Sequence, residues 1–160
     1  MRNSLVVIRN GRLKDRQKVV HVWQEFMDYH KRISTMDNEL VEEAAEMWMK
    51  YYDRHVRSPV MKALVAEQDG EIVGFLLGEI QKRPPIFKAS HPAYLDSIGV
   101  VESRRNQGIG GMMIDQFAKW AREKGAPFIM LNVVVENASA QRLYEKLGFK
   151  TTILAQRKLL

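Results

Sequence analysis

The sequence contains no cysteine. This absence excludes disulfide bonds, cysteine-based zinc sites and any reaction that passes through a cysteinyl acyl-enzyme. No apolar run approaches the roughly 20 residues that are needed to cross a bilayer, and the first residues lack the pattern of a secretory signal. We therefore expect a cytoplasmic protein that has no membrane partner.

Internal repeats, low-complexity tracts and glycine- or serine-rich linkers are also absent. The 160 residues fit one domain, and a domain of this size can bury about 70% of the surface of its unfolded chain. Apolar residues make up 46% and charged residues 28%, as is ordinary for a globular protein. We expect a single domain over residues 1–160.

Positive charge is in excess, with 25 Lys and Arg against 19 Asp and Glu and a formal net charge of +6. Such an excess can attract nucleic acid, an acidic partner or a polyphosphate cofactor. However, the basic residues are spread along the chain, and the densest clusters are the pairs Lys82-Arg83 and Arg104-Arg105. We interpret the excess as a solvated basic surface, and nucleic acid is not the favoured partner.

Hydrophobic spacing and turn residues divide the chain into strands and helices. Strands are expected over Leu5–Asn10, Met61–Gln68, Glu71–Gln81, Ala93–Val101 and Phe128–Val135, with a last strand from Phe149. Helices are expected over Lys14–Tyr29, between an N-cap at Asp37-Asn38 and Ser58-Pro59, and over Gly108–Lys124 and Ala138–Leu147. The order β-α-α-β-β-β-α-β-α-β predicts an α/β or α+β domain, with one mixed, mostly antiparallel sheet and helices on both faces.

A glycine-rich segment, Arg105–Gly111, joins the strand Ala93–Val101 to the helix that follows it. The first N–H groups of a helix have no partner inside the helix, and the helix dipole adds positive charge there. Glycine lets an anion approach this backbone closely. The segment is therefore suited to a phosphate or pyrophosphate, and Arg104 and Arg105 add charge beside it.

Glycines in this pattern can also serve only to shape a tight turn, and two nucleotide-binding motifs do not fit. A P-loop requires Gly-Lys-Ser/Thr, whereas Gly111 is followed by Met112. A dinucleotide-binding fold requires a third glycine three residues after Gly110, where this chain has Met113.

Two motifs together resemble the GNAT superfamily of acyl-CoA-dependent N-acetyltransferases. Arg105-Asn106-Gln107-Gly108-Ile109-Gly110 is similar to the family signature Arg/Gln-x-x-Gly-x-Gly/Ala. Residues 137–149 (Asn-Ala-Ser-Ala-Gln-Arg-Leu-Tyr-Glu-Lys-Leu-Gly-Phe) are similar to its segment Asn-x-x-Ala-x-x-Leu-Tyr-x-x-x-Gly-Phe. The resemblance implies a GNAT-like fold and acetyl-CoA or coenzyme A as cosubstrate, without a metal.

The resemblance also implies where the cosubstrate binds. Amides of the loop would hold the pyrophosphate, the strand around Ile98–Val101 would pair its free edge with the pantetheine arm, and Asn137 would bond the same arm where two parallel strands splay. The implied cofactor-binding residues are Ile98, Gly99, Val100, Val101, Arg105, Asn106, Gln107, Gly108, Ile109, Gly110, Gly111, Asn137 and Tyr144.

Tyr144 matches a tyrosine that lies near the thioester sulfur in many relatives. A tyrosine with a pKa of about 10 can protonate a thiolate of pKa about 8.5 as it leaves. However, Ala140, Leu143, Tyr144 and Leu147 also form an apolar helical stripe, so a structural role in the core is the alternative.

The general base stays open among several residues. An alkylamine has a pKa near 10.4, so its proton must be accepted before it attacks. Asp96 and Tyr94 precede the loop, and Glu79 lies on the preceding strand. Strict alternation places Tyr94, Asp96, Ile98 and Val100 on one face. His91, in a loop before a proline, is a weaker candidate.

The acceptor is expected to be a primary amine, either a small molecule, which is slightly favoured, or a peptide (protein N-terminus or lysine). The aromatic residues Trp23, Trp48, Tyr51 and Tyr52 of the first two helices favour a core over a substrate pocket. A regulatory module that binds acyl-CoA without turnover is an alternative of another class. A homodimer stays open.

Overall fold

The computed structural model describes residues 5–34, 39–158 and 160. The bounds of its elements are β1 Val7–Asn10, the 3-10 helix η1 Leu13–Asp15, α1 Arg16–Ile33, α2 Ala44–Arg57, β2 Met61–Gln68, β3 Glu71–Ile80, β4 Ala93–Val100, the 3-10 helix η2 Glu102–Arg104, α3 Ile109–Glu123, β5 Ile129–Leu131 and α4 Ala138–Lys146. The N-cap expected at Asp37-Asn38 lies outside the described residues, and α2 begins later, at Ala44.

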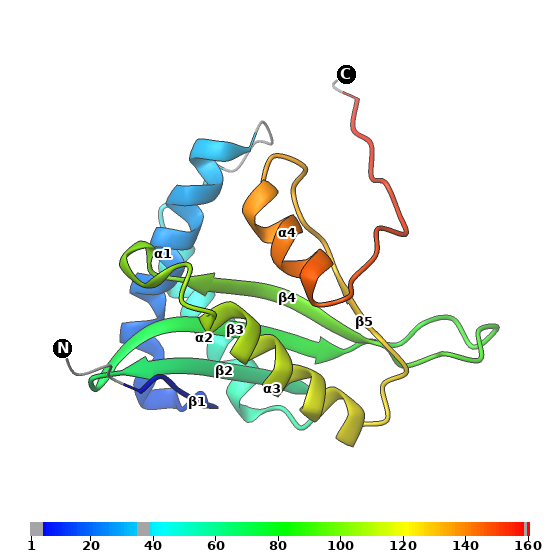
Figure 1. The fold of residues 1–160 in the computed structure, drawn as a ribbon, viewed down its shortest axis with the longest axis horizontal. Helices are drawn as coiled ribbons and strands as arrows, with labels where there is room; N and C mark the ends of the chain where they lie inside the picture. Colours follow the sequence, from blue (N-terminus) through cyan, green and yellow to red (C-terminus); the bar gives the residue numbers. More distant parts are fainter. Residues whose placement is uncertain (1–4, 35–38, 159) are drawn as a thin grey trace.

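The five strands form one sheet in the order β1-β2-β3-β4-β5, as Figure 1 shows. The pairs β1–β2, β2–β3 and β3–β4 are antiparallel, and β4–β5 is parallel. Asp69 and Gly70 connect β2 to β3 with φ values of 55° and 78°. Positive φ at both central residues is what a two-residue hairpin turn requires. The prediction of a mixed, mostly antiparallel sheet is confirmed.

Helices cover both faces of the sheet (Figure 1), so strand residues that alternate in direction are buried on both sides. Val65, Phe75 and Leu77 pack against α1 and α2, on what we call the α1/α2 face. Leu64 and Leu76 pack against α3 and α4, on the α3/α4 face. This two-sided burial holds β3 and β4 in place between the two helical layers, and β4 leads into the loop before α3.

Two strand predictions are wrong. β5 covers only Ile129–Leu131 of the expected Phe128–Val135, and Val135 is 77% exposed rather than buried. The described residues from Phe149 to the C-terminus contain no strand, and Leu154 is 78% exposed. This last segment runs away from the sheet (Figure 1), so its β-branched residues have no neighbouring strand to bond. Strand propensity needs such a neighbour to take effect.

Within the described ranges, no helix combines the length and apolar character needed to span a membrane.

Candidate active site

The glycine-rich loop turns the chain from β4 into α3 through two left-handed residues. Asn106 has φ 60° and Gly108 has φ 78°, and Gly108 is the N-cap of α3. Glycine adopts this conformation without the clash that a Cβ atom causes. Gly110 has a different reason to be glycine, since an added Cβ would lie 3.2 Å from Cδ2 of Leu143 in α4.

The loop presents unpaired hydrogen-bond donors. Met112 N–H donates to the carbonyl of Gly108 at 3.1 Å and closes the first turn of α3. In the part of the chain that the structure describes, the N–H groups of Gly108, Ile109, Gly110 and Gly111 have no acceptor. These donors and the positive end of the dipole of a 15-residue helix suit an anion such as a pyrophosphate.

Arg105 is held in place beside this loop. Its Nε donates to the carbonyl of Val100 at 3.0 Å, and its guanidinium carbon lies 4.6 Å from the ring centre of Tyr29. The Tyr29 hydroxyl in turn donates a long hydrogen bond (3.5 Å) to Oδ1 of Asn137. Tyr29 of α1 therefore connects the two segments that carry the family motifs, a role that the sequence did not indicate.

Asn137 is the N-cap of α4. Its Oδ1 also accepts the N–H of Ala140 at 3.1 Å, and the residue is 8% exposed. The side-chain oxygen of Asn137 therefore has a structural role, since it caps the N-terminus of α4.

The edge of β4 that faces β5 opens near its middle. β4 pairs with β5 only from Ala93 to Leu95, while its pairing with β3 continues to Val100. Val101 N–H donates to Val73 at 2.9 Å. Because bonding directions alternate along an antiparallel strand, the N–H and C=O groups of Ile98 and Val100 point to the opposite, open edge. This is the edge that we expected to be free for a ligand, although the Val100 carbonyl already accepts from Arg105.

Gly99 is required for helix packing. A Cβ there would lie 2.8 Å from Cε1 of Phe75 and 3.3 Å from Cβ of Phe26. Its absence therefore lets α1 approach β4 closely, next to the open edge.

A bulge in β4 corrects the predicted face of Asp96. Gly78 pairs with Leu95, and Leu77 pairs with Ser97, so Asp96 is an extra residue in the strand. From this residue on, the alternate side chains of β4 point to the opposite face from the one that strict alternation predicts. The side chains of Ala93, Leu95, Ile98 and Val100 pack on the α3/α4 face, and Asp96 does not share a face with Ile98 and Val100. Strict alternation gave the wrong answer because it allows no extra residue.

Tyr51, Glu79, Tyr94 and Asp96 form what we call the polar cluster, on the α1/α2 face. Glu79 and Tyr94 are direct cross-strand partners, so their side chains share a face. Tyr51 of α2 lies near enough to Asp96 and Glu79 for the charges of both carboxylates to act on its hydroxyl. All three predicted base candidates in β3 and β4 are therefore brought together.

Burial and the neighbouring carboxylates keep the tyrosines of the cluster protonated. Burial, then the charge of Asp96 and the hydrogen bond to it, raise the pKa of Tyr51 to about 12. Burial first, then the charges of Asp96 and Glu79, raises the pKa of Tyr94 above its usual value. A tyrosine with a raised pKa donates hydrogen bonds but accepts a proton poorly in this form, so the carboxylates are the better bases of the cluster.

Two residues of α2 near the polar cluster were missed from the sequence. His55 is 1% exposed, its Nδ1 lies 2.9 Å from the carbonyl of Tyr51, and burial lowers its pKa. Arg54 is exposed, and its guanidinium carbon lies 5.0 Å from the ring centre of Tyr51. Their spacing of three and four residues from Tyr51 on one helix was the available signal.

His91 does not join this group. It is exposed in the loop between β3 and β4, and its Nδ1 lies 2.8 Å from Oγ of Ser90.

Tyr144 lies on the opposite face, in the core between α4 and the sheet. It is 8% exposed, and its ring centre lies 5.7 Å from that of Phe149. Burial raises the pKa of Tyr144 to about 12. Its hydroxyl donates to no other described residue.

The aromatic residues of α1 and α2 belong mainly to the core. Trp23 is 6% exposed and stacks on Trp48 with ring centres 5.1 Å apart, and Tyr52 is fully buried. The interpretation of this stripe as core, favoured over a substrate pocket, fits these contacts.

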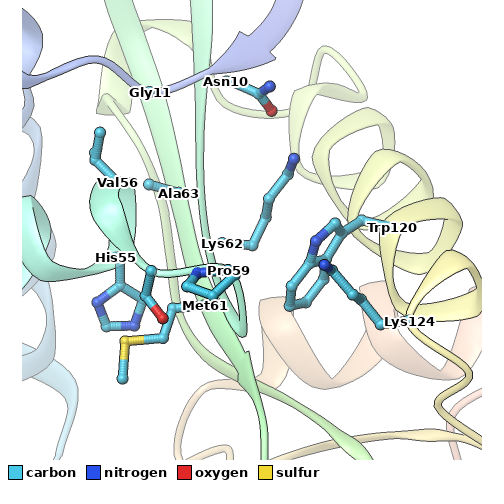
Figure 2. Close-up of a pocket in the computed structure, with 11 residues that line it drawn as sticks. Asn10, Gly11, His55, Val56, Pro59, Met61, Lys62, Ala63, Trp120 and Lys124 are labelled. Atoms are coloured by element: carbon cyan, nitrogen blue, oxygen red, sulfur yellow. The ribbon is translucent and has the colours of Figure 1, made fainter.

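Figure 2 shows a cavity of about 240 Å³ in another part of the molecule. Lys62, Trp120 and Lys124 lie on one side of β2, and His55 and Met61 lie on the other (Figure 2). Trp120 comes eleven residues after the start of α3, roughly 16 Å along the helix axis. The cavity is therefore separate from the glycine-rich loop.

Comparisons with known proteins identify the family of this fold. The model of the acetyltransferase (GNAT) family matches residues 21–149, which is most of the chain. The chain is 30% identical over 153 residues to the L-amino acid N-acetyltransferase AaaT of Escherichia coli (strain K12), covering 92% of this chain and 84% of that protein. It is 29% identical over 151 residues to an N-alpha-acetyltransferase of Sulfurisphaera tokodaii, covering 89% and 79%.

A solved structure also has this fold. The aminoglycoside N-acetyltransferase AAC(6')-Iy in complex with CoA superposes with a TM-score of 0.74 at 19% identity, over 98% of this chain and 97% of that chain. Together with the family match, these similarities show that the chain belongs to the GNAT acetyltransferase family and is an N-acetyltransferase.

Proposed function

We propose that this N-acetyltransferase transfers an acetyl group from acetyl-CoA to a primary amine, with both substrates bound at once. One observation carries the proposal: the unpaired N–H groups at the start of α3 lie next along the chain to the open edge of β4. The first suits a pyrophosphate, and the second suits the amides of a pantetheine arm, which can add to a strand edge as a peptide does. The residues present therefore fit coenzyme A.

Several side chains support this binding mode. Arg105, fixed between Val100 and Tyr29, holds positive charge next to the loop. Asn137 uses Oδ1 to cap α4, which leaves its Nδ2 group to donate to the pantetheine arm. Gly108, with φ of 78°, gives the loop the left-handed turn that exposes these N–H groups, and Gly110 leaves room for Leu143 of α4.

Bound acetyl-CoA supplies a thioester whose acyl carbon reacts with a neutral amine. At pH 7 only about one alkylamine in 2,000 is neutral, so the enzyme gains by removing the amine proton. We assign this role to Asp96, directly or through a water molecule, because the bulge turns it toward Tyr51 and Glu79. Tyr94, which stays protonated, would help to position the amine through its hydroxyl.

Tyr144 is the proposed proton donor to the leaving thiolate. Its pKa of about 12 keeps it protonated at any physiological pH, and its hydroxyl is not committed to another described residue. Placing two substrates together in fixed orientation supplies the rest of the rate acceleration.

Two acceptor classes are compatible with this site. The names of two relatives, an L-amino acid N-acetyltransferase and an N-alpha-acetyltransferase, both refer to an amino group on an α-carbon. They support an α-amine as the acceptor, in a free amino acid or at a protein N-terminus. A small molecule is slightly favoured, and a lysine side chain is the less supported alternative.

The test has two arms. Calorimetry with coenzyme A should give binding, and thiol release from acetyl-CoA should be seen with at least one class in a panel of amino acids, peptides and aminoglycosides. Binding without turnover on any amine would contradict the transfer proposal and leave the cofactor site in place. No binding of coenzyme A would overturn both.

A further inference from the structure

Arg54 carries a positive charge, and no carboxylate of the described residues lies within ion-pair distance of it. Arg9, Arg16 and Arg32 each lie within ion-pair distance of an acidic side chain. In the described ranges Arg54 has no such partner, and its guanidinium carbon lies 5.0 Å from the centre of the Tyr51 ring. A guanidinium in this state has all its donors available to a bound carboxylate.

Two carboxylates, those of Asp96 and Glu79, lie near the same tyrosine. The charges of Asp96 and Glu79 both act on Tyr51, and the strand pairing places these two carboxylates on the α1/α2 face beside it. Glu79 is held by Gln81, whose Nε2 donates to Oε1 at 3.1 Å, and Asp96 accepts from Oγ of Ser97 at 3.3 Å. Opposite charges therefore lie near one aromatic ring, with the carboxylates of β3 and β4 on the side of the sheet and Arg54 over the face of the ring.

We propose that the acceptor carries a carboxylate close to its amine, as a free α-amino acid does, and that Arg54 binds this carboxylate while Asp96 and Glu79 face the amine. This inference rests on the proposed function. Arginine suits the role because its planar fork matches the two carboxylate oxygens. A peptide N-terminus has an amide next to its amine and would leave Arg54 without a partner. Arg54 would therefore select free amino acids over peptide N-termini.

The experiment compares L-amino acids with their amides, which differ only at the group that Arg54 would bind. kcat/KM is measured by thiol release for both compounds with wild type, Arg54→Gln and Arg57→Gln. Arg57 is the matched control because it lies one turn further on α2, is exposed and has no ion-pair partner among the described residues. The acid-to-amide ratio of kcat/KM is compared between variants. The intrinsic reactivity of each amine is the same for every variant and therefore cancels in this comparison.

Wild type should favour the acid, and Arg54→Gln should lower the acid-to-amide ratio by about 10-fold to 10²-fold, the range for a lost charged hydrogen bond. The change should appear mainly in KM for the acid, while Arg57→Gln keeps the wild-type ratio. An unchanged ratio in Arg54→Gln, or equal use of acid, amide and peptide by wild type, would overturn the inference and leave the transfer reaction standing.

A binding measurement checks the same point without turnover. N-acetyl-leucine should raise the Tm of wild type more than N-acetyl-leucinamide does in the presence of coenzyme A, and Arg54→Gln should remove this difference. Equal shifts with both compounds in wild type would contradict the role of Arg54, even if acetylation itself is observed. If none of the tested amines is acetylated, the proposed function itself is refuted.

Discussion

The glycine-rich loop and the polar cluster are built in different ways. The loop Arg105–Gly111 offers backbone N–H groups from consecutive residues, and its geometry depends on left-handed backbone at Asn106 and Gly108. The polar cluster is made of side chains that come from α2, β3 and β4. A backbone site is therefore encoded by adjacent residues, whereas the cluster exists only after three distant segments have met.

This difference separates two measurable quantities. Changes in the loop should act on coenzyme A affinity, because the loop is the proposed phosphate site. Changes in the polar cluster or at Tyr144 should act on the chemical step, because these are the groups that we propose move or hold protons.

The largest effect is expected for Tyr144→Phe. This variant keeps the packing against Phe149 and removes only the hydroxyl. kcat should fall by about 10²-fold or more, with nearly unchanged affinity for coenzyme A. The raised pKa, about 12, also means that wild type keeps this donor protonated as the pH rises to about 11. If the variant keeps the wild-type kcat, Tyr144 has only a structural role.

Asp96→Asn should lower kcat/KM by about 10²-fold at pH 7, the lower end of general-base effects. The ratio of wild-type to variant kcat/KM should decrease as the pH approaches 10, because the amine then loses its proton to the solvent without a general base. Ser97→Ala, which removes the hydroxyl that donates to Asp96, is the control and should stay near wild type. A ratio of wild-type to variant kcat/KM that stays constant with pH would argue against Asp96 as the base.

In the loop, Gly108→Ala should weaken coenzyme A binding by about 10-fold, because a left-handed residue with a Cβ costs about 1–2 kcal/mol. The added Cβ meets no atom within 4 Å, so the effect comes from φ of 78° and not from a clash. Gly111→Ala is the matched control: it lies in helical conformation with open space and should raise Tm slightly. Calorimetry and thermal unfolding check the pair, and equal losses in both variants would contradict the conformational explanation.

The smallest effect concerns stability and His55. Burial lowers the pKa of His55 in the folded state, so below about pH 6.5 the unfolded chain binds a proton that the folded chain does not. Its contribution to stability is full above that pH and is lost as the pH falls, by at most about 1.4 kcal/mol per pH unit. Urea unfolding at pH 7.5 and 5.5 should show a weaker pH dependence in His55→Asn than in wild type, whereas the exposed His21→Asn should keep the wild-type slope.

Much of the fold could be predicted because its signals are local. The hairpin turn at Asp69-Gly70, the helix after Gly108 and the alternation of apolar residues in β2 and β3 each depend on a few neighbouring residues. The last strand was wrong because a strand also requires an edge to pair with, and the segment after Phe149 has none among the described residues.

The site divides in the same way. The sequence alone determined the glycine-rich loop and the pair of family motifs, because backbone conformation and glycine placement are set by adjacent residues. Only the tertiary structure decided which face Asp96 occupies and that Tyr29 links Arg105 to Asn137. It also placed Arg54 and Tyr51 beside the carboxylates of β3 and β4. A strand bulge and the packing of α1 and α2 set these relations, and both depend on contacts between residues far apart in the chain.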